Sequence, residues 1–139
     1  MPVAHIDDTL DMYYEIDDYT DPWKTSETIV LQHGNTRSSV FWYAWVPHLA
    51  RQYKVVRPDY RGMGRSTVPP PGFQPTFSSM AKDLKTLLDQ LELDQVHLVA
   101  EATGGSVAMQ LAYEYPERLK SLILCGSQSA NVAAVGSML

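Results

Sequence analysis

The spacing of apolar residues changes along the chain from short runs to a helical period, and these changes predict the elements. Short apolar or β-branched runs have the length of strands and cover residues 3–6, 12–16, 28–32, 53–60, 95–100 and 119–127. Apolar residues at helical intervals follow Thr76 and predict an amphipathic helix that ends near Leu91. The same spacing after Gly104 predicts a second helix, which Pro116 stops.

A third helical pattern lies between residues 40 and 52 and is rich in aromatic side chains. Ser38 and Ser39 can cap its start, and Pro47 is expected to bend the helix or to break it into two turns. One face of this helix would carry Phe41, Trp42, Trp45 and Leu49.

Strand and helix patterns alternate from residue 28 to residue 127. Because crossover connections are right-handed and place helices on both faces, we expect an α/β fold with a doubly wound, mostly parallel sheet. The first two runs flank Asp7, Asp8 and Thr9, whose side chains favour a turn, so an N-terminal β-hairpin is expected. A length of 139 residues and 45% hydrophobic content predict a single domain over residues 1–139. The stretch 128–139 fits a helix start or a severed end.

The charge pattern argues against polyanionic partners. The chain has 11 basic and 16 acidic residues, a formal net charge of −5 and no basic cluster, so neither nucleic acid nor a membrane is an expected partner. The N-terminus has no leader pattern, and no apolar run approaches the ~20 residues of a membrane span. We expect a soluble, cytoplasmic protein in which the single cysteine, Cys125, is a small buried apolar residue.

Neither a cofactor nor a metal is expected from the motifs. Gly62-Met63-Gly64 lacks the lysine and the glycine spacing of a phosphate-binding loop. Histidines and carboxylates do not pair at the spacing of metal ligands on a helix. The sequence therefore predicts a small-molecule substrate and no bound cofactor.

The candidate chemistry lies in three loops that follow the third, fourth and fifth runs, because sites in open α/β sheets lie beyond the carboxyl ends of strands. The third loop contains the stretch VAEATGG, in which the small residues Ala100 and Gly104 stand two positions before and after Ala102. A sharp strand-to-helix turn that presents a nucleophile needs this spacing, since neighbouring backbone comes too close for larger side chains.

These motifs together resemble the α/β-hydrolase fold family, in particular its esterase, enol-lactonase and carbon–carbon hydrolase branch. The resemblance covers roughly residues 10–128 and rests on IVLQHGN, VVRPDYRGMGRST, VHLVAEATGG and YPERLKSLIL in the family's order. Each motif alone is weak, whereas the set is specific.

The resemblance implies a reaction and the roles of several residues. The backbone N–H groups of Asn35 and Thr103 would form an oxyanion hole, with His33 and Gly34 shaping the loop before Asn35. The implied reaction is the hydrolysis of an ester, lactone or related acyl bond of a small molecule by a Ser-His-Asp mechanism without a cofactor.

The chain departs from the family at Ala102, where the family has its nucleophile. A methyl group has no lone pair, so it cannot attack a carbonyl carbon or hold an acyl intermediate, and this chain should be inactive as a serine hydrolase. Since the small residues of the turn persist around one inert residue, we favour a Ser→Ala variant that traps substrate. The alternative is a natural pseudoenzyme, a small-molecule binding module.

The catalytic acid and histidine of the family follow later strands, so both are expected beyond Leu139. His5 and His48 look like surface residues, and His33 should support its loop. His97 falls within a strand and should be packed in the core or against a helix. The chain thus resembles the N-terminal half of a hydrolase without its cap, which a C-terminal segment, a second chain or a homo-oligomer would complete.

Further residues beside these loops are weaker candidates. Glu101, Arg37, Phe41 and Trp42 could line a substrate pocket, although a supporting carboxylate, a surface arginine and core aromatic residues are simpler interpretations. The hydroxyl of Thr103 should face away from the pocket while its N–H faces it. Asp59 and Arg61 resemble a structural pair of the family that shapes its loop without taking part in catalysis.

Overall fold

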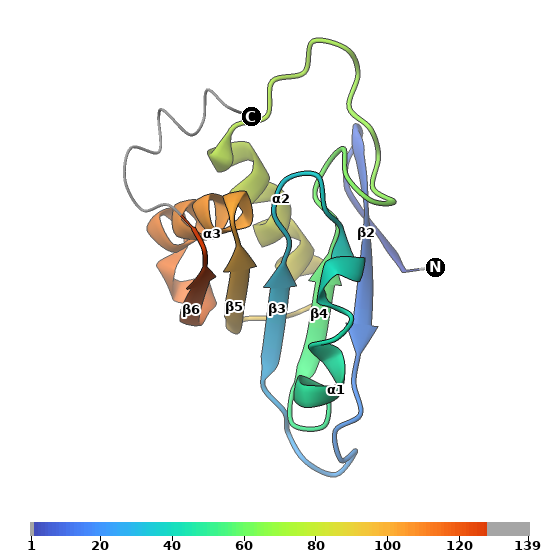
Figure 1. Cartoon of the computed structure of the whole chain (residues 1–139), viewed down its shortest axis with the longest axis vertical. Coiled ribbons are helices and arrows are strands. Elements are labelled where there is room, and N and C mark those ends of the chain that lie inside the picture. Colours follow the sequence, from blue (N-terminus) through green and yellow to red (C-terminus); the bar gives the residue numbers. More distant parts are fainter. Residues whose placement is uncertain (1, 128–139) are drawn as a thin grey trace.

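The structure is a computed structural model that describes residues 2–127, and it contains a six-stranded sheet with helices on both faces (Figure 1). The strands are β1 (Val3–Asp7), β2 (Leu10–Asp17), β3 (Thr28–Gln32), β4 (Lys54–Pro58), β5 (Val96–Glu101) and β6 (Leu119–Cys125). Their order across the sheet is β1-β2-β4-β3-β5-β6. The strands β4, β3, β5 and β6 pair in parallel, which confirms the predicted doubly wound, mostly parallel sheet.

The predicted N-terminal hairpin is present and extends the sheet on one side. β1 pairs antiparallel with β2, and β2 pairs antiparallel with β4. The Asp7 carboxylate accepts hydrogen bonds from the N–H and the hydroxyl of Thr9 at 2.7 and 2.6 Å, so the side chains that favour a turn do close it.

The helices α2 (Phe77–Gln90) and α3 (Thr103–Glu114) cover one face of the sheet. α2 begins at the predicted cap, where the Thr76 hydroxyl accepts a hydrogen bond from the Ser79 N–H and the Ser79 hydroxyl bonds back to the Thr76 N–H. The short 3-10 helix η2 (Pro116–Arg118) follows α3, as the stop at Pro116 predicted. The core of this face includes Val30, Leu84, Leu98, Val107 and Leu111.

The aromatic segment on the other face is broken, as Pro47 predicted. It forms the 3-10 helix η1 (Ser39–Trp42) and a single turn, α1 (Val46–Leu49), with proline at its start. The expected apolar face is wrong in part: Trp42 is buried, whereas Phe41 and Trp45 are exposed by 38% and 43%. A break between two short helices removes the common face that one continuous helix would have had.

The central strands place the three candidate loops together. β4, β3 and β5 are adjacent and parallel, so the loops that follow their carboxyl ends meet at one edge of the sheet (Figure 1). Within residues 2–127, no helix is both long and apolar enough to cross a bilayer. The predicted helix start at 128–139 lies outside the described residues.

Candidate active site

β5 passes into α3 through a sharp turn centred on Ala102. This residue has φ 49° and ψ −122°, a conformation that costs a residue other than glycine about 1–3 kcal/mol. Its N–H donates to the carbonyl of Cys125 at 3.0 Å, and its own carbonyl accepts from the Gly105 N–H at 2.9 Å. The turn is therefore anchored to β6 on one side and to the first turn of α3 on the other.

The small-residue requirement of this turn has a direct structural cause at Gly104. A β-carbon there would clash with the carbonyl oxygen of His33 and would lie 3.0 Å from that of Gln32. The end of β3 and the start of α3 therefore touch through their backbones. This contact brings the loop after β3 against the turn.

The loop after β3 lies next to the turn, as the sequence predicted for an oxyanion hole. The Asn35 N–H donates to the Thr103 hydroxyl oxygen at 2.7 Å. Thr103 is the first residue of α3, so its N–H belongs to the amides that a helix leaves without an intrahelical acceptor. The structure thus brings the chain segments of Asn35 and Thr103 together.

The predicted orientation of the Thr103 side chain is wrong. We expected the hydroxyl to face away from the pocket, but it accepts the N–H of Asn35, one of the two amides that were expected to line that pocket. The physical reason is that a backbone N–H requires an acceptor, and the hydroxyl supplies one at this position.

Glu101 supports the loop from the end of β5. Its Oε2 accepts the Gly34 N–H at 2.9 Å, and its Oε1 lies 3.4 Å from Nε of Arg37. The Arg37 guanidinium in turn lies 4.3 Å above the ring of Phe41. Glu101 is the supporting carboxylate of the simpler interpretation, and Arg37 and Phe41 border the same loop.

Trp42 is a core residue, whereas its neighbour Phe41 borders the loop after β3. Its side chain is 1% exposed and packs in the core with Leu31 and Val99. Phe41 and Trp45 contact it edge-to-face with ring centroids 5.0 and 4.9 Å away. The structure thus favours the core interpretation of Trp42 over a place at a pocket mouth.

His33 is a buried, neutral support of the loop. Its Nε2 lies 3.1 Å from the Tyr60 N–H, which can only donate, so Nδ1 carries the proton and donates to the Gly34 carbonyl at 2.7 Å. Burial lowers the pKa of His33, against the opposing effects of the Gly34 carbonyl and the carboxylates of Asp59 and Glu101. The expectation that His33 supports its turn is confirmed.

Asp59 supports the loop after β4, as expected of a structural residue, and it does so without bonding to Arg61. The Asp59 carboxylate accepts the N–H groups of Ser39 and Arg65 at 2.5 and 2.9 Å, and it ties η1 to the loop after β4. Arg61 instead bonds Asp83 of α2 and Asp7 of β1 at 3.0 and 2.8 Å. Backbone donors close to Asp59 satisfy its oxygens, which leaves Arg61 free to reach other carboxylates.

The remaining histidines lie away from the turn. His5 and His48 are exposed, as expected. His97 is not a packed core residue: its side chain is 24% exposed and bonds Ser121 and Glu27. It lies near the amino-terminal end of β5, where polar side chains are its hydrogen-bond partners. Among the described residues, no group of three or more metal-ligating side chains is assembled.

Comparison with known proteins identifies the family. The family model for the alpha/beta hydrolase fold matches residues 27–138. RutD of Caulobacter vibrioides, named as a candidate carbamate hydrolase, is 34% identical over 119 residues, which are 85% of this chain and 43% of that protein.

Solved structures agree with this assignment. A hydrolase from Pseudomonas aeruginosa PA01 superposes with a TM-score of 0.84 and 28% identity, over 92% of this chain and 46% of that one. The enol-lactonase from Burkholderia xenovorans LB400 gives a TM-score of 0.82 and 25% identity, over 91% of this chain and 46% of that one. The chain thus spans less than half the length of these relatives. By its sequence and its fold, the chain belongs to the alpha/beta hydrolase fold family.

Proposed function

We propose that this chain carries the carbonyl-binding half of a hydrolase site for an ester, lactone or related acyl bond, with alanine at the attacking position. The observation that carries the proposal is the strained turn at Ala102, with the segments of Asn35 and Thr103 beside it. The names of two relatives, a candidate carbamate hydrolase and an enol-lactonase, refer to acyl compounds and support this substrate class.

The N–H groups of Asn35 and Thr103 would stabilise a negatively charged oxygen. The Thr103 hydroxyl accepts the Asn35 N–H, and a ligand oxygen would take its place after a rotation of that side chain. One preorganised donor of this kind is worth about 2.7–4 kcal/mol toward a tetrahedral intermediate. The partial positive charge at the start of α3 acts in the same direction.

Ala102 would prevent the covalent step of the reaction. Its methyl group offers no lone pair, so an acyl compound would bind without forming an acyl-enzyme at this position. A substrate-trapping variant of a serine enzyme and a natural binding module share this behaviour. The codon for residue 102 in the genomic gene distinguishes the two explanations. A serine codon would identify the chain as a substrate-trapping variant, and an alanine codon would identify it as a natural binding module.

A titration tests the binding half of the proposal. Butyrate, added to the ¹⁵N-labelled full chain, should shift the amide signals of Asn35 and Thr103 more than those of other residues. The matched variant Ala102→Leu fills the space above the two amides and should abolish these shifts while the fold is retained. Shifts confined to other parts of the chain would contradict the proposal.

A second measurement tests the missing covalent step. After incubation with p-nitrophenyl butyrate, peptide mass spectrometry should find no butyryl group on residues 100–105. An acylated side chain within this turn would show that the chain has a nucleophile there, and the proposal would fail.

A further inference from the structure

A second cluster of chemically active side chains lies near the amino-terminal ends of the parallel strands. The Ser121 hydroxyl of β6 lies 2.6 Å from Nδ1 of His97 in β5, and Oε2 of Glu27 lies 2.5 Å from Nε2 of the same ring. His97 precedes Ala102 by five strand residues, which corresponds to roughly 16 Å. The cluster is therefore separate from the turn that carries the proposed function.

The hydrogen bonds define which nitrogen carries the proton when the His97 ring is neutral. Bonding to His97 and to Lys120 lowers the pKa of Glu27, so its carboxylate is ionised and can only accept. In a neutral ring, Nε2 of His97 then carries the proton, and Nδ1 offers a lone pair. The Ser121 hydroxyl must donate to Nδ1, which gives the order serine, histidine, carboxylate of a catalytic triad.

Neighbouring groups hold the ring and the carboxylate in place. The Lys120 ammonium lies 3.1 Å from the second carboxylate oxygen of Glu27. The Tyr53 ring contacts His97 edge-to-face, with centroids 6.0 Å apart. The Glu27 carboxylate and the His97 ring are thus each contacted by a residue that is distant from them in sequence.

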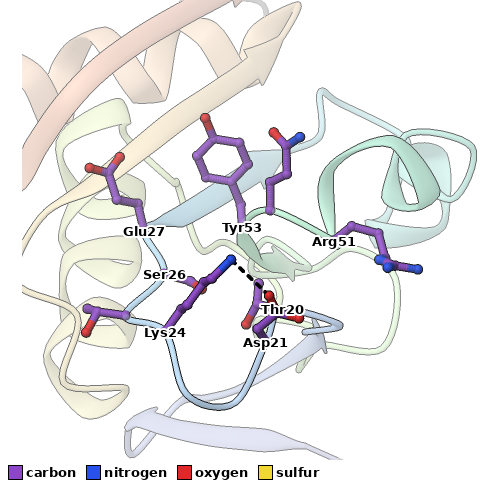
Figure 2. A pocket seen from close by; sticks show the side chains of 9 residues that line it. Thr20, Asp21, Lys24, Ser26, Glu27, Arg51 and Tyr53 are labelled. Atoms are coloured by element: carbon purple, nitrogen blue, oxygen red, sulfur yellow. Dashed lines mark ion pairs between the residues drawn. The ribbon is translucent and has the colours of Figure 1, made fainter.

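Reagents in solution can reach this cluster. The side chains of His97 and Glu27 are 24% and 49% exposed, and Ser121 is partly exposed. Glu27 and Tyr53 also line a polar cavity of about 510 Å³, in which Figure 2 shows Lys24 paired with Asp21. The cluster therefore has open space on the side of its carboxylate.

We propose that Ser121 is a nucleophile that His97 and Glu27 activate, and that activated acyl donors such as aryl esters acylate it. The Ser121 oxygen would bond to the carbonyl carbon while its proton passes to Nδ1 of His97. The bond to the aryl oxygen breaks, and the phenolate leaves with the electron pair. Glu27 balances the charge of the imidazolium until that ring returns its proton to solvent.

The proposal is limited to donors with good leaving groups. A phenolate leaves without being protonated, so acylation needs only the base that the structure supplies. A general base in such a step contributes about 10²- to 10⁴-fold to the rate. We therefore expect acylation of Ser121 as a modification, and not the turnover of amides.

The full chain, treated with p-nitrophenyl acetate, tests this inference by site-resolved mass spectrometry. Ser121 should be acetylated about 100-fold faster than Ser78, a reference whose exposed hydroxyl donates to Glu114 at 2.6 Å and has no imidazole partner. His97→Asn should bring Ser121 down to the rate of Ser78. Equal rates in the unaltered chain, or a rate that His97→Asn leaves unchanged, would overturn the proposal.

Three further measurements separate an active relay from structural hydrogen bonds. The ¹⁵N signals of the His97 ring should show the proton on Nε2, and a proton on Nδ1 would overturn the proposal because Ser121 would then accept. Glu27→Gln should lose this tautomer preference and slow acetylation. Ser121→Ala should remove the adduct without changing the melting temperature. None of these results depends on anion binding at Asn35 and Thr103, so the two proposals fail independently.

Discussion

Ala102 combines a strained backbone with a side chain that has no chemistry of its own. Its positive φ and its hydrogen bonds to β6 and α3 belong to a turn built to present a side chain. A methyl group cannot use that presentation. The strain therefore remains as a property of the folded chain that stability measurements can detect.

Ala102→Gly should raise the free energy of unfolding by about 1 kcal/mol. Glycine adopts positive φ freely, so it relieves about 1–3 kcal/mol of strain against an entropy cost of about 0.5–1 kcal/mol. Urea denaturation measures the change. The matched change Ala112→Gly, inside α3, should lower the free energy of unfolding by about 1 kcal/mol. An equal decrease in the free energy of unfolding in both variants would contradict a strained turn.

At this scale the sequence predicted what local sterics dictate. Ala100 and Gly104 mark the turn because the backbone of β3 touches that of α3 there. The Thr103 hydroxyl could not be placed, since its role depends on the Asn35 N–H, which comes near only in the folded chain. The bonds from Asp59 to Ser39 and from Arg61 to Asp83 could not be predicted for the same reason, since these partners come near only in the folded chain.

Among the elements, α2 and the hairpin are joined by a largely buried charged group. The guanidinium of Arg61 bonds Asp83 of α2 and Asp7 of β1, and the side chains of Arg61 and Asp83 are 6% and 9% exposed. Burial raises the pKa of Asp83, while the Arg61 guanidinium acts in the opposite direction. The sequence contains a signal for this buried charge, because Asp83 lies on the apolar face of the helical pattern.

Asp83→Asn should lower the free energy of unfolding by about 3 kcal/mol, because it leaves the Arg61 charge poorly compensated in a buried place. Asp21→Asn removes an exposed pair with Lys24 and should cost less than about 1 kcal/mol. Chemical denaturation of both variants compares the two sites. A loss at Asp83 no larger than that at Asp21 would show that the network is not a structural tie.

The elements themselves were predictable where the pattern was regular. α2 begins directly after its predicted cap, Thr76, and β3 covers the predicted run. The aromatic segment was predicted less well: the break at Pro47 was expected, but which aromatic side chains become buried depends on how each short helix meets the sheet. Trp42 turned inward, and Phe41 and Trp45 did not.

At the scale of the whole molecule, three loops meet at one edge of the sheet, and His33 is the buried residue between them. Its ring bonds the backbone of Gly34 and of Tyr60, so it joins the loops after β3 and β4. The alternation of strands and helices predicted this meeting of loops. The cluster around His97 was not predictable, because it depends on the register that places Ser121 beside His97.

The neutral state of His33 predicts how stability depends on pH. Burial lowers the pKa of His33 in the folded chain, so the unfolded chain binds this proton first as the pH falls. The contribution of the neutral His33 ring to the free energy of unfolding is complete above the unfolded pKa of about 6.5. It is lost as the pH falls from there toward the lowered pKa of the folded chain. The urea concentration at the midpoint of unfolding should be measured at about pH 7.5 and at about pH 5.5. The difference between the two values should be larger for the unaltered chain than for His33→Asn. The same difference in both would contradict a buried neutral ring.

The central claim is that residue 102 occupies an attacking position beside two amides poised for an oxyanion. Ala102→Cys places a thiol there, and Gln74→Cys places one in an exposed loop as a control. Each variant reacts with p-nitrophenyl acetate in one experiment and with iodoacetamide in another. Peptide mass spectrometry distinguishes modification of the introduced thiol from modification of Cys125. An oxyanion hole assists acylation but not alkylation, so the ratio of the two rates should be at least about tenfold higher at position 102. Equal ratios at the two positions would contradict the account.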